Sequence, residues 1–202
     1  MNNYLENLNE EQRKPVLHTD GPLMVIAGAG SGKTRVLTYK IIHLLKKGIS
    51  PFNILALTFT NKAAKEMKQR ISKLTNENQA KSIWMGTFHS VFARILRSES
   101  ELIGFPSNFT IYDSYDSEKL ISNIIKEMNL NKDFYKAKSI KNRISSLKNS
   151  FITPKNYFNH PEHIESDKLA NRIQFGEIYR NYVNRCFKSA VMDFDDLLIF
   201  PL

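Results

Sequence analysis

The sequence predicts an α/β fold on the basis of three observations. Short apolar segments at 22–27, 53–58 and 82–85 alternate with helical patterns in the first half of the chain. Such alternation is typical of a parallel sheet covered by helices. The first apolar segment runs into a glycine-rich turn that leads directly into a helix. From about Thr110 onward the pattern is helical, which predicts a second, mostly helical subdomain.

Each element of the first half has a local reason. Asn9, three residues before Gln12, has the spacing of a helix cap, so a short helix is expected to begin there. Pro22–Ala27 is expected to form a buried strand, and Lys33–Lys47 a helix that Gly48 stops. The other expected elements are a strand at Asn53–Thr58, a helix capped by Asn61, a strand at Ser82–Met85 and a helix with Phe88, Val91, Phe92, Ile95 and Leu96 on one face.

Helices at 116–128, 136–149 and 166–189 are expected in the second half, with no strand of comparable quality. The third helix has a wide apolar stripe of Phe175, Ile178, Tyr179, Tyr182, Val183, Cys186 and Phe187. A further apolar helix is expected to begin at Asp193 and to stop after about two turns, with Ile199, Phe200 and Leu202 left uncovered. We interpret this ending as a truncation, because a domain seldom ends on an exposed apolar edge.

The composition is that of a folded protein with an excess of positive charge. The apolar runs at 23–27 and 54–57 are too short to span a membrane, and the acidic N-terminus lacks the apolar core of a secretory signal. Cys186 is the only cysteine, which excludes an intrachain disulfide and fits a reducing cytoplasm. The net charge of +9, from 29 Lys and Arg against 20 Asp and Glu, favours a polyanionic partner.

Positive charge is concentrated between residues 132 and 155. This stretch has one acid, Asp133, and the cations Lys132, Lys136, Lys138, Lys141, Arg143, Lys148 and Lys155. A solvated helix face is the simplest interpretation of such a run, and contact with a polyanion is the functional one.

Residues 24–37, MVIAGAGSGKTRVL, have the features of a phosphate-binding loop. Backbone N–H groups of 28–33 can converge on a phosphate at the helix N-terminus, where the helix dipole adds positive potential. Lys33 is expected to reach the β- and γ-phosphates, and Thr34 to offer its hydroxyl to Mg²⁺. The candidate loop residues are Ala27, Gly28, Ala29, Gly30, Ser31, Gly32, Lys33 and Thr34, with Ala27 in place of the usual first glycine of G-x-x-x-x-G-K-[ST]. A loop of this kind indicates nucleotide binding and leaves the reaction open.

The neighbouring motifs resemble those of UvrD/PcrA/Rep-type superfamily 1 DNA helicases. LNEEQRKPV (8–16) resembles the Q motif of that family, and AGAGSGKT (27–34) resembles its motif I, in which alanine commonly takes the first position. LALTFTNKAAKEMKQRI (55–71) resembles motif Ia, and GTFHSVFARIL (86–96) resembles the DNA-contacting motif that follows. The order and spacing of the four motifs also match over about the first 100 residues. MDFDDLL (192–198) is similar to the stretch where a helical insertion returns to the motor domain.

The resemblance implies a role for particular residues. Gln12 would recognise the adenine of ATP, although its spacing from Asn9 also fits a capping box, and Arg35 would lie near the nucleotide or simply on the helix surface. The residues implied to contact DNA are Phe59, Thr60, Asn61, Thr87, Phe88 and His89. Core packing remains the alternative for the two phenylalanines, and a helix N-cap the alternative for Asn61.

The resemblance also implies a domain organisation and an activity. Residues 1–109 would be the first segment of a RecA-like motor domain, 110–190 a helical insertion, and 191–202 the start of the return into the motor domain. No D-E-x-x-D sequence follows, so we expect an N-terminal fragment with little ATPase activity of its own. The intact protein would be an ATP- and Mg²⁺-dependent DNA helicase that moves 3′ to 5′ along a single strand, with duplex DNA near the basic insertion.

Two other groups of polar residues are weaker candidates. His160 and His163, with Cys186, could suggest a metal site, but histidines beside a loop proline are more often exposed to solvent. Asp193, Asp195 and Asp196 could suggest a divalent-ion site, but acids at a helix start are favoured by capping and by the helix dipole.

Three other functions stay open at this point. The chain could be the helicase part of a helicase–nuclease, whose nuclease would lie downstream. It could be a P-loop kinase or nucleotide-binding switch unrelated to DNA. It could also be a DNA-binding module whose loop grips the phosphate backbone, in which case Lys33→Ala would weaken DNA binding as much as nucleotide binding.

Overall fold

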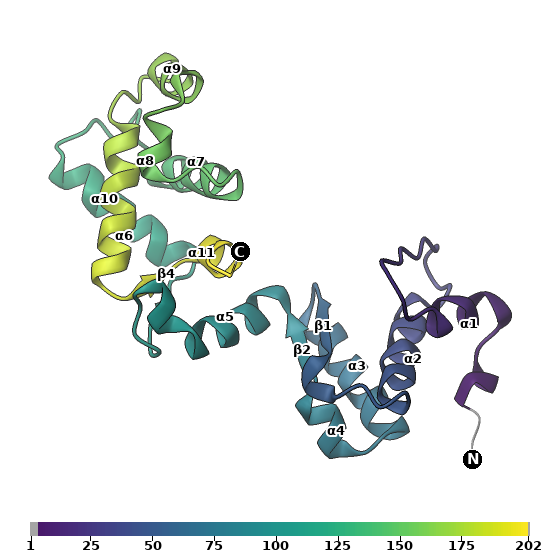
Figure 1. The fold of residues 1–202 in the computed structure, drawn as a ribbon. Helices are drawn as coiled ribbons and strands as arrows, with labels where there is room; N and C mark the ends of the chain where they lie inside the picture. The colour runs from purple at the N-terminus through teal and green to yellow at the C-terminus, as the bar shows by residue number, and fades with distance from the viewer. Residues whose placement is uncertain (1–3, 202) are drawn as a thin grey trace. The chain divides into compact units, whose positions relative to one another are not determined.

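The computed structural model describes residues 4–201 and shows a mixed α/β protein (Figure 1). The chain divides into two compact units, Met1–Val91 and Phe92–Leu202. The domain boundaries predicted at 109–110 and 190–191 stay predictions. Within residues 4–201, no helix is long and apolar enough to cross a membrane.

The first unit alternates helices and strands. Its elements are η1 (Tyr4–Asn7), α1 (Glu10–Leu17), α2 (Lys33–Lys46), η2 (Pro51–Asn53), β1 (Leu55–Thr58), α3 (Asn61–Leu74), α4 (Glu77–Ser82) and β2 (Trp84–Thr87). Strands β1 and β2 pair in parallel, from Leu55 opposite Trp84 to Thr58 opposite Thr87. Helices α2, α3 and α4 pack a hydrophobic core beside this sheet. The core contains Ile41, Leu45, Ile54, Ala56, Met67, Ile71, Ala80 and Ile83.

The prediction of a buried strand at Pro22–Ala27 is wrong. Residues 22–27 form no strand, and Met24 and Ile26 are 81% and 86% exposed. A buried strand needs neighbours that satisfy its backbone N–H and C=O groups. Within residues 4–201, no strand pairs with this segment, so its apolar pattern alone does not produce one.

Other features of the first unit also differ from expectation. The N-cap of α3 is Thr60, whose hydroxyl accepts a hydrogen bond from the Ala63 N–H at 3.2 Å, so Asn61 is the first helical residue rather than the cap. Helix α4 was not predicted. It includes Ser82, and the following strand therefore begins at Trp84.

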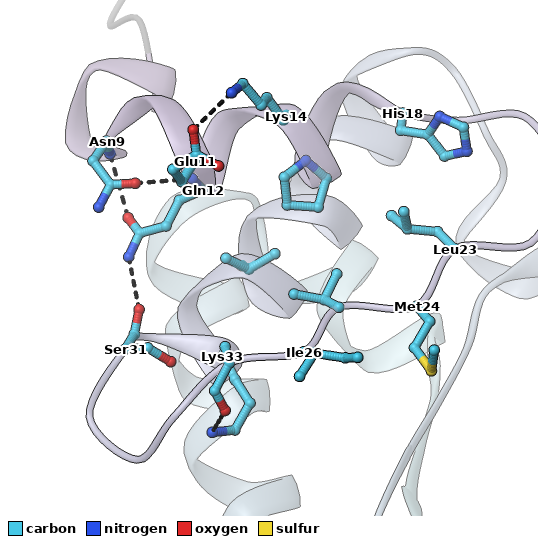
Figure 2. A pocket seen from close by; sticks show the side chains of 14 residues that line it. Asn9, Glu11, Gln12, Lys14, His18, Leu23, Met24, Ile26, Ser31 and Lys33 are labelled. Carbon is cyan, nitrogen blue, oxygen red and sulfur yellow. Dashed lines mark hydrogen bonds and ion pairs between the residues drawn. The ribbon is translucent and has the colours of Figure 1, made fainter.

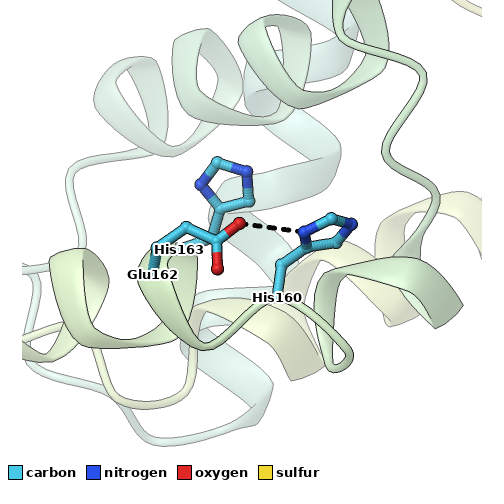
Figure 3. A group of neighbouring side chains, drawn as sticks. All are labelled: His160, Glu162 and His163. Atoms are coloured by element: carbon cyan, nitrogen blue, oxygen red, sulfur yellow. Dashed lines mark hydrogen bonds and ion pairs between the residues drawn. The ribbon is translucent and has the colours of Figure 1, made fainter.

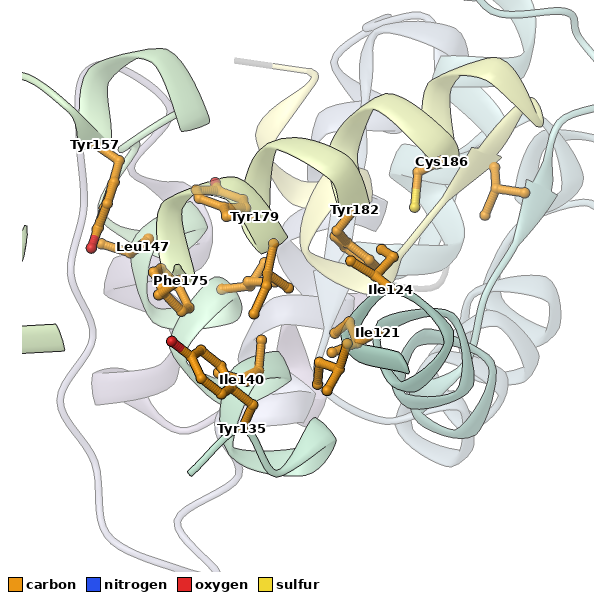
Figure 4. Close-up of a cluster of buried hydrophobic side chains, with 14 residues drawn as sticks. Ile121, Ile124, Tyr135, Ile140, Leu147, Tyr157, Phe175, Tyr179, Tyr182 and Cys186 are labelled. Atoms are coloured by element: carbon orange, nitrogen blue, oxygen red, sulfur yellow. The ribbon is translucent and has the colours of Figure 1, made fainter. Parts of the chain in front are cut away.

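The second unit is mainly helical, as predicted. Its elements include α5 (Phe88–Ser98, which begins in the first unit), η3 (Ser100–Ile103), β3 (Thr110–Ile111), α6 (Ser114–Glu127), α7 (Ala137–Asn149), α8 (Pro154–Tyr157), α9 (Pro161–Leu169), α10 (Phe175–Lys188), β4 (Val191–Met192) and α11 (Phe194–Ile199). Strands β3 and β4, which the sequence did not reveal, pair in parallel over two residues each. Figure 4 shows the main core, in which α6, α7 and α10 pack Ile121, Ile124, Ile140, Ile144, Leu147, Phe175, Ile178, Tyr179 and Tyr182 together.

The single helix predicted at 166–189 is wrong, because the structure divides this stretch into α9 and α10. Asn171 adopts a left-handed φ of 56° just after α9. Its N–H donates to the Lys168 carbonyl at 2.9 Å, and the Arg172 N–H donates to the Asp167 carbonyl at 2.8 Å. These two bonds form a Schellman motif, which ends the helix and redirects the chain toward α10.

Candidate functional site

The glycine-rich loop lies between the extended segment 22–27 and helix α2. Gly30 and Gly32 have φ angles of 77° and 90°, a region that favours glycine. Gly32 is the N-cap of α2 and supplies no side-chain hydrogen bond, and the first turn of the helix contains no acid. The first N–H groups of α2 therefore lack a side-chain cap, and the positive end of the helix dipole favours an anion there.

Lys33 holds the loop in its present form. Its Nζ donates to the carbonyl oxygens of Ala27 and Gly28, each at 2.7 Å. The Ser31 hydroxyl donates to the same Gly28 carbonyl at 2.7 Å. The lysine that the sequence assigns to phosphate binding is thus folded back onto the loop, and its exposed side chain leaves room for it to turn outward.

The other predicted loop residues lie around this contact. Ala27 is half-buried, whereas Ala29 and Thr34 are exposed, with Thr34 in the first turn of α2. Arg35 is also exposed, and its guanidinium carbon lies 5.8 Å from the centre of the Tyr39 ring. The structure therefore brings the loop residues together and leaves the Thr34 hydroxyl accessible.

Gln12 makes both a cap and a contact with the loop. Asn9 and Gln12 form the capping box of α1, with the Gln12 N–H donating to Asn9 Oδ1 at 2.8 Å. The Gln12 amide Nε2 also donates to the Ser31 carbonyl at 3.1 Å (Figure 2). The capping alternative is confirmed, and the same side chain ties α1 to the loop.

A cavity of about 670 Å³ opens between α1, the segment 22–27 and the loop. Figure 2 shows Gln12, His18, Ile26 and Lys33 among the side chains around it. Its size falls within the range of about 300–1,000 Å³ that is usual for small-molecule sites. Apolar walls from 23–27 and polar groups from α1 and the loop suit a ligand with a flat ring and an anionic tail.

A second group of predicted residues meets at the carboxyl ends of β1 and β2. Because Thr58 and Thr87 are paired in register, Phe59 and Phe88 leave the sheet at the same edge. Their ring centres lie 5.9 Å apart, and Phe59 is 93% exposed. Core packing for Phe59 is therefore wrong, and Phe88, at 37% exposed, is only partly covered. The carboxyl edge of parallel strands is where α/β proteins commonly bind ligands.

The polar neighbours of these rings serve first as helix caps. The Thr60 hydroxyl caps α3, and the Thr87 hydroxyl accepts a hydrogen bond from the Ser90 N–H at 3.3 Å. Asn61 is exposed and His89 is half-buried. The structure places all six predicted DNA-contacting residues at this edge, with Asn61 available at its surface.

Much of the basic run at 132–155 is used inside the second unit. Lys141 pairs with Glu118 at 3.3 Å, Arg143 with Asp167 at 3.2 Å, and Lys148 is buried against two aspartates. The cations of the run that are exposed are Lys132, Lys136, Lys138 and Lys155. The solvated-face interpretation therefore holds for only part of the run.

Lys148, a member of the basic run, is buried, which its sequence context did not indicate. Its Nζ lies 2.7 Å from Asp193 Oδ2 and 2.6 Å from Asp196 Oδ1. Asp193 and Asp196 also form the capping box of α11, so the capping interpretation of this acidic cluster is confirmed. Burial acts to lower the pKa of Lys148, but the two carboxylates outweigh it and raise that pKa above its usual value.

The histidine pair also differs from expectation. Pro161 begins helix α9, so His160 is the N-cap and His163 lies in the first turn rather than in a loop. The carboxylate of Glu162 lies close to both imidazoles, whereas Cys186 is buried in the main core of the second unit. Burial raises the pKa of the Cys186 thiol to about 12, which makes it a poor metal ligand.

The parallel strands and the helices beside them define an α/β protein, and the loop before α2 has the sequence pattern of a phosphate-binding loop. Residues 8–202 match the family model of the UvrD/REP helicase N-terminal domain, and the chain belongs to this family. It is 43% identical over 200 residues to a protein named ATP-dependent DNA helicase PcrA from Staphylococcus epidermidis, and 42% identical to one of the same name from Staphylococcus aureus. Each alignment covers 98% of this chain and 26% of the relative, so the chain spans about a quarter of these relatives' length.

Proposed function

We propose that this chain binds ATP with Mg²⁺, and single-stranded DNA, as the N-terminal part of a 3′–5′ DNA helicase with a RecA-like first motor domain. The observation that carries the proposal is that two features lie in one compact unit. The first is the glycine-rich loop before α2, a helix whose N-terminus has no side-chain cap. The second is the aromatic edge formed by Phe59 and Phe88 after β1 and β2. Family membership and the names of the relatives support the choice of ATP and DNA. The 3′–5′ direction rests on the resemblance of the motifs alone.

The loop residues fit the phosphates of a nucleotide. Lys33 exchanges the Ala27 and Gly28 carbonyls for the β- and γ-phosphate oxygens, which charge-assisted hydrogen bonds favour. The exposed Thr34 hydroxyl holds Mg²⁺, and the open space around Gly28 and Gly30 admits the phosphate chain. Gln12 presents its amide to the adenine edge while keeping its cap on α1. Bound MgATP supplies the phosphoanhydride bond whose hydrolysis drives movement of the intact helicase.

The aromatic edge suits a single strand because bases can stack on it without sequence preference. Phe59 offers an almost fully exposed ring, and Phe88, the first residue of α5, lies beside it with the ring centres 5.9 Å apart. The exposed cations Lys132, Lys136, Lys138 and Lys155 are the part of the basic run that we assign to duplex DNA. No D-E-x-x-D sequence occurs in the 202 residues, so we expect the chain alone to hydrolyse ATP far more slowly than its full-length relatives.

Nucleotide binding is tested by replacing Lys33. The change Lys33→Ala is expected to weaken MgATP binding by at least about tenfold, because a charge-assisted contact contributes about 1.5–3 kcal/mol. Isothermal titration calorimetry measures the affinity, and Lys62→Ala, an exposed lysine on α3, is the matched control. An unchanged MgATP affinity would contradict the nucleotide site. An equal loss of DNA affinity would favour the DNA-binding module instead.

Binding of single-stranded DNA is tested at Phe59. Since one stacked base contributes about 1–3 kcal/mol, Phe59→Ala is expected to weaken oligonucleotide binding by roughly 5- to 150-fold. Fluorescence anisotropy measures it, with Phe52→Ala as the control, because Phe52 is 68% exposed on η2, outside this edge. Log K for the wild type should fall with log salt at about −0.7 per neutralised phosphate. A flat salt response, or equal effects of the two variants, would rule out this interface.

A further inference from the structure

A cluster of three metal-ligating side chains lies at the start of helix α9, in the second unit. His160, Glu162 and His163 each offer one ligand atom, and these atoms all lie within 4.8 Å of one another (Figure 3). The Nδ1 atom of His160 is 2.9 Å from Glu162 Oε1. Neither the P-loop nor the aromatic edge uses these residues, so they have no role in the function proposed above.

The local backbone explains why these side chains converge. His160 is the N-cap of α9, and Pro161 fixes the first helical residue. The His163 N–H donates to the His160 carbonyl at 3.1 Å, which closes a tight turn between the two histidines. Residues three apart on a helical turn face the same side, so the two imidazoles lie near one another and near the Glu162 carboxylate (Figure 3). Their ring centres lie 5.6 Å apart.

From this geometry we infer that His160, Glu162 and His163 form a zinc-binding site. Two imidazoles and one carboxylate are a ligand set that Zn²⁺ commonly takes, with a water or an anion in the fourth position. Ligand atoms around a tetrahedral Zn²⁺ lie about 3.4 Å apart, which follows from bond lengths of about 2.0–2.1 Å. The side chains of His160 and Glu162 are 43% and 63% exposed, so both can rotate to close the remaining gap.

The surroundings position His163 and limit the positive charge beside the site. Arg143 Nη2 lies 3.4 Å from His163 Nδ1, a long distance for a hydrogen bond, so a metal competes there with a weak contact. Asp167 pairs with Arg143 at 3.2 Å and accepts a hydrogen bond from the Tyr157 hydroxyl at 3.0 Å. The charge of Arg143 is therefore balanced within the same cluster.

The site has a structural consequence for the turn between α8 and α9. A bound Zn²⁺ joins the residue before α9 to the first turn of the helix, and so opposes fraying of that end. Mg²⁺ does not substitute, because it prefers oxygen ligands and near-octahedral geometry. The zinc site is thus distinct in chemistry from the magnesium site proposed at Thr34.

The experiment is a titration of the 202-residue chain with Zn²⁺ against a chromophoric chelator, followed by a thermal melt with and without the metal. We expect one Zn²⁺ per chain and a higher melting temperature when it is bound. The changes His160→Ala, His163→Ala and Glu162→Gln should each weaken Zn²⁺ binding by about tenfold or more, since even outer-shell changes cost about 10–100-fold. Far-ultraviolet circular dichroism confirms that each variant is folded.

The controls separate this site from other zinc ligands. His18→Ala removes an exposed histidine outside the cluster, and Glu165→Gln removes an exposed acid one turn further along α9. Both should bind Zn²⁺ as the wild type does. Wild-type affinity in folded His160→Ala or His163→Ala overturns the site. Wild-type affinity in Glu162→Gln overturns the three-ligand arrangement, and an excess of Mg²⁺ that displaces Zn²⁺ overturns the choice of metal.

Discussion

At the scale of single residues, Gly32 meets two demands at the junction of the loop and α2. Its φ of 90° lies in the left-handed region, and a Cβ atom at this position would lie 2.7 Å from Gln12 Nε2. The Gln12 amide needs that space because it donates to the Ser31 carbonyl. A side chain at Gly32 would therefore strain the backbone and displace the contact that joins α1 to the loop.

We predict that Gly32→Ala lowers the free energy of unfolding by about 1–2 kcal/mol from the backbone conformation alone. MgATP binding should weaken as well, because Gln12 has to move. Urea denaturation measures the stability. Gly28→Ala is the stability control, since a Cβ there meets no atom within 4 Å and its φ is not left-handed. Equal stability losses in the two variants would show that neither the φ of Gly32 nor its closeness to Gln12 matters.

Residues within one local motif could be predicted from the sequence. The box of Asn9 and Gln12 follows from their spacing, and Gly32 and Lys33 follow from the glycine pattern. The bond from Gln12 to Ser31 could not be predicted, because it joins residues 19 positions apart through tertiary packing. The self-bonded state of Lys33 was also missed, since the motif describes contacts with phosphate and not with the loop's own carbonyls.

At the scale of elements, the buried charge of Lys148 fastens helix α7 to helix α11. One ammonium group lies between two carboxylates, and the Tyr182 hydroxyl of α10 donates to Asp193 at 2.9 Å. Although burial acts to raise it, the Lys148 ammonium lowers the pKa of Asp193 below its usual value. Burial raises the pKa of Asp196 to about 6. The Lys148 charge opposes this rise, and the Asp193 charge adds to it. The two carboxylates therefore have opposite effects on stability as the pH changes.

This arrangement predicts a pH dependence that belongs to Asp196. In the folded state the pKa of Asp196 rises from 3.8 to about 6, so folding favours the protonated carboxyl. Protonation of Asp196 therefore stabilises the folded state at low pH, and this contribution is lost as the pH rises from about 4 to 6. The change Asp196→Asn removes that loss. The variant should therefore gain stability relative to the wild type across this pH range, measured by urea denaturation at several pH values.

The matched control for this prediction is Asp195→Asn. Asp195 lies in the same turn of α11 and accepts a hydrogen bond from Asn149 instead of Lys148. A pH-dependent gain in Asp195→Asn equal to that in Asp196→Asn would contradict the assignment of the effect to Asp196. A pH-independent difference for Asp196→Asn would show that its carboxyl does not titrate differently on folding.

Helices were easier to predict than their connections. The patterns at 33–47, 116–128 and 136–149 each correspond to a helix, because the apolar spacing that marks them is local. The Schellman motif at Asn171 ends α9 inside the stretch that was predicted as a single helix. Asparagine is a known residue for a left-handed helix end, and that signal was available at this position. The partners of Lys148, 45 and 48 positions away, carried no local signal.

At the scale of the whole molecule, the α/β character was predicted but the extent of the sheet was not. Each sheet within residues 4–201 has two parallel strands. The exposed apolar residues of 22–27 have the composition of a central strand without the neighbours that would make it one. Whether an apolar run becomes a strand depends on its pairing with distant segments, which local sequence does not reveal. The chain spans 26% of the relatives' length.

The exposed segment 22–27 has a consequence for how the chain withstands proteases. A protease that cuts beside large apolar residues meets Leu23, Met24 and Ile26 with an unpaired, accessible backbone. Cleavage there would not release the N-terminal piece, because Leu8 and Val16 are buried against Tyr39 of α2. The nicked chain would migrate as one particle on a native sizing column, and its two fragments would separate only in denaturant.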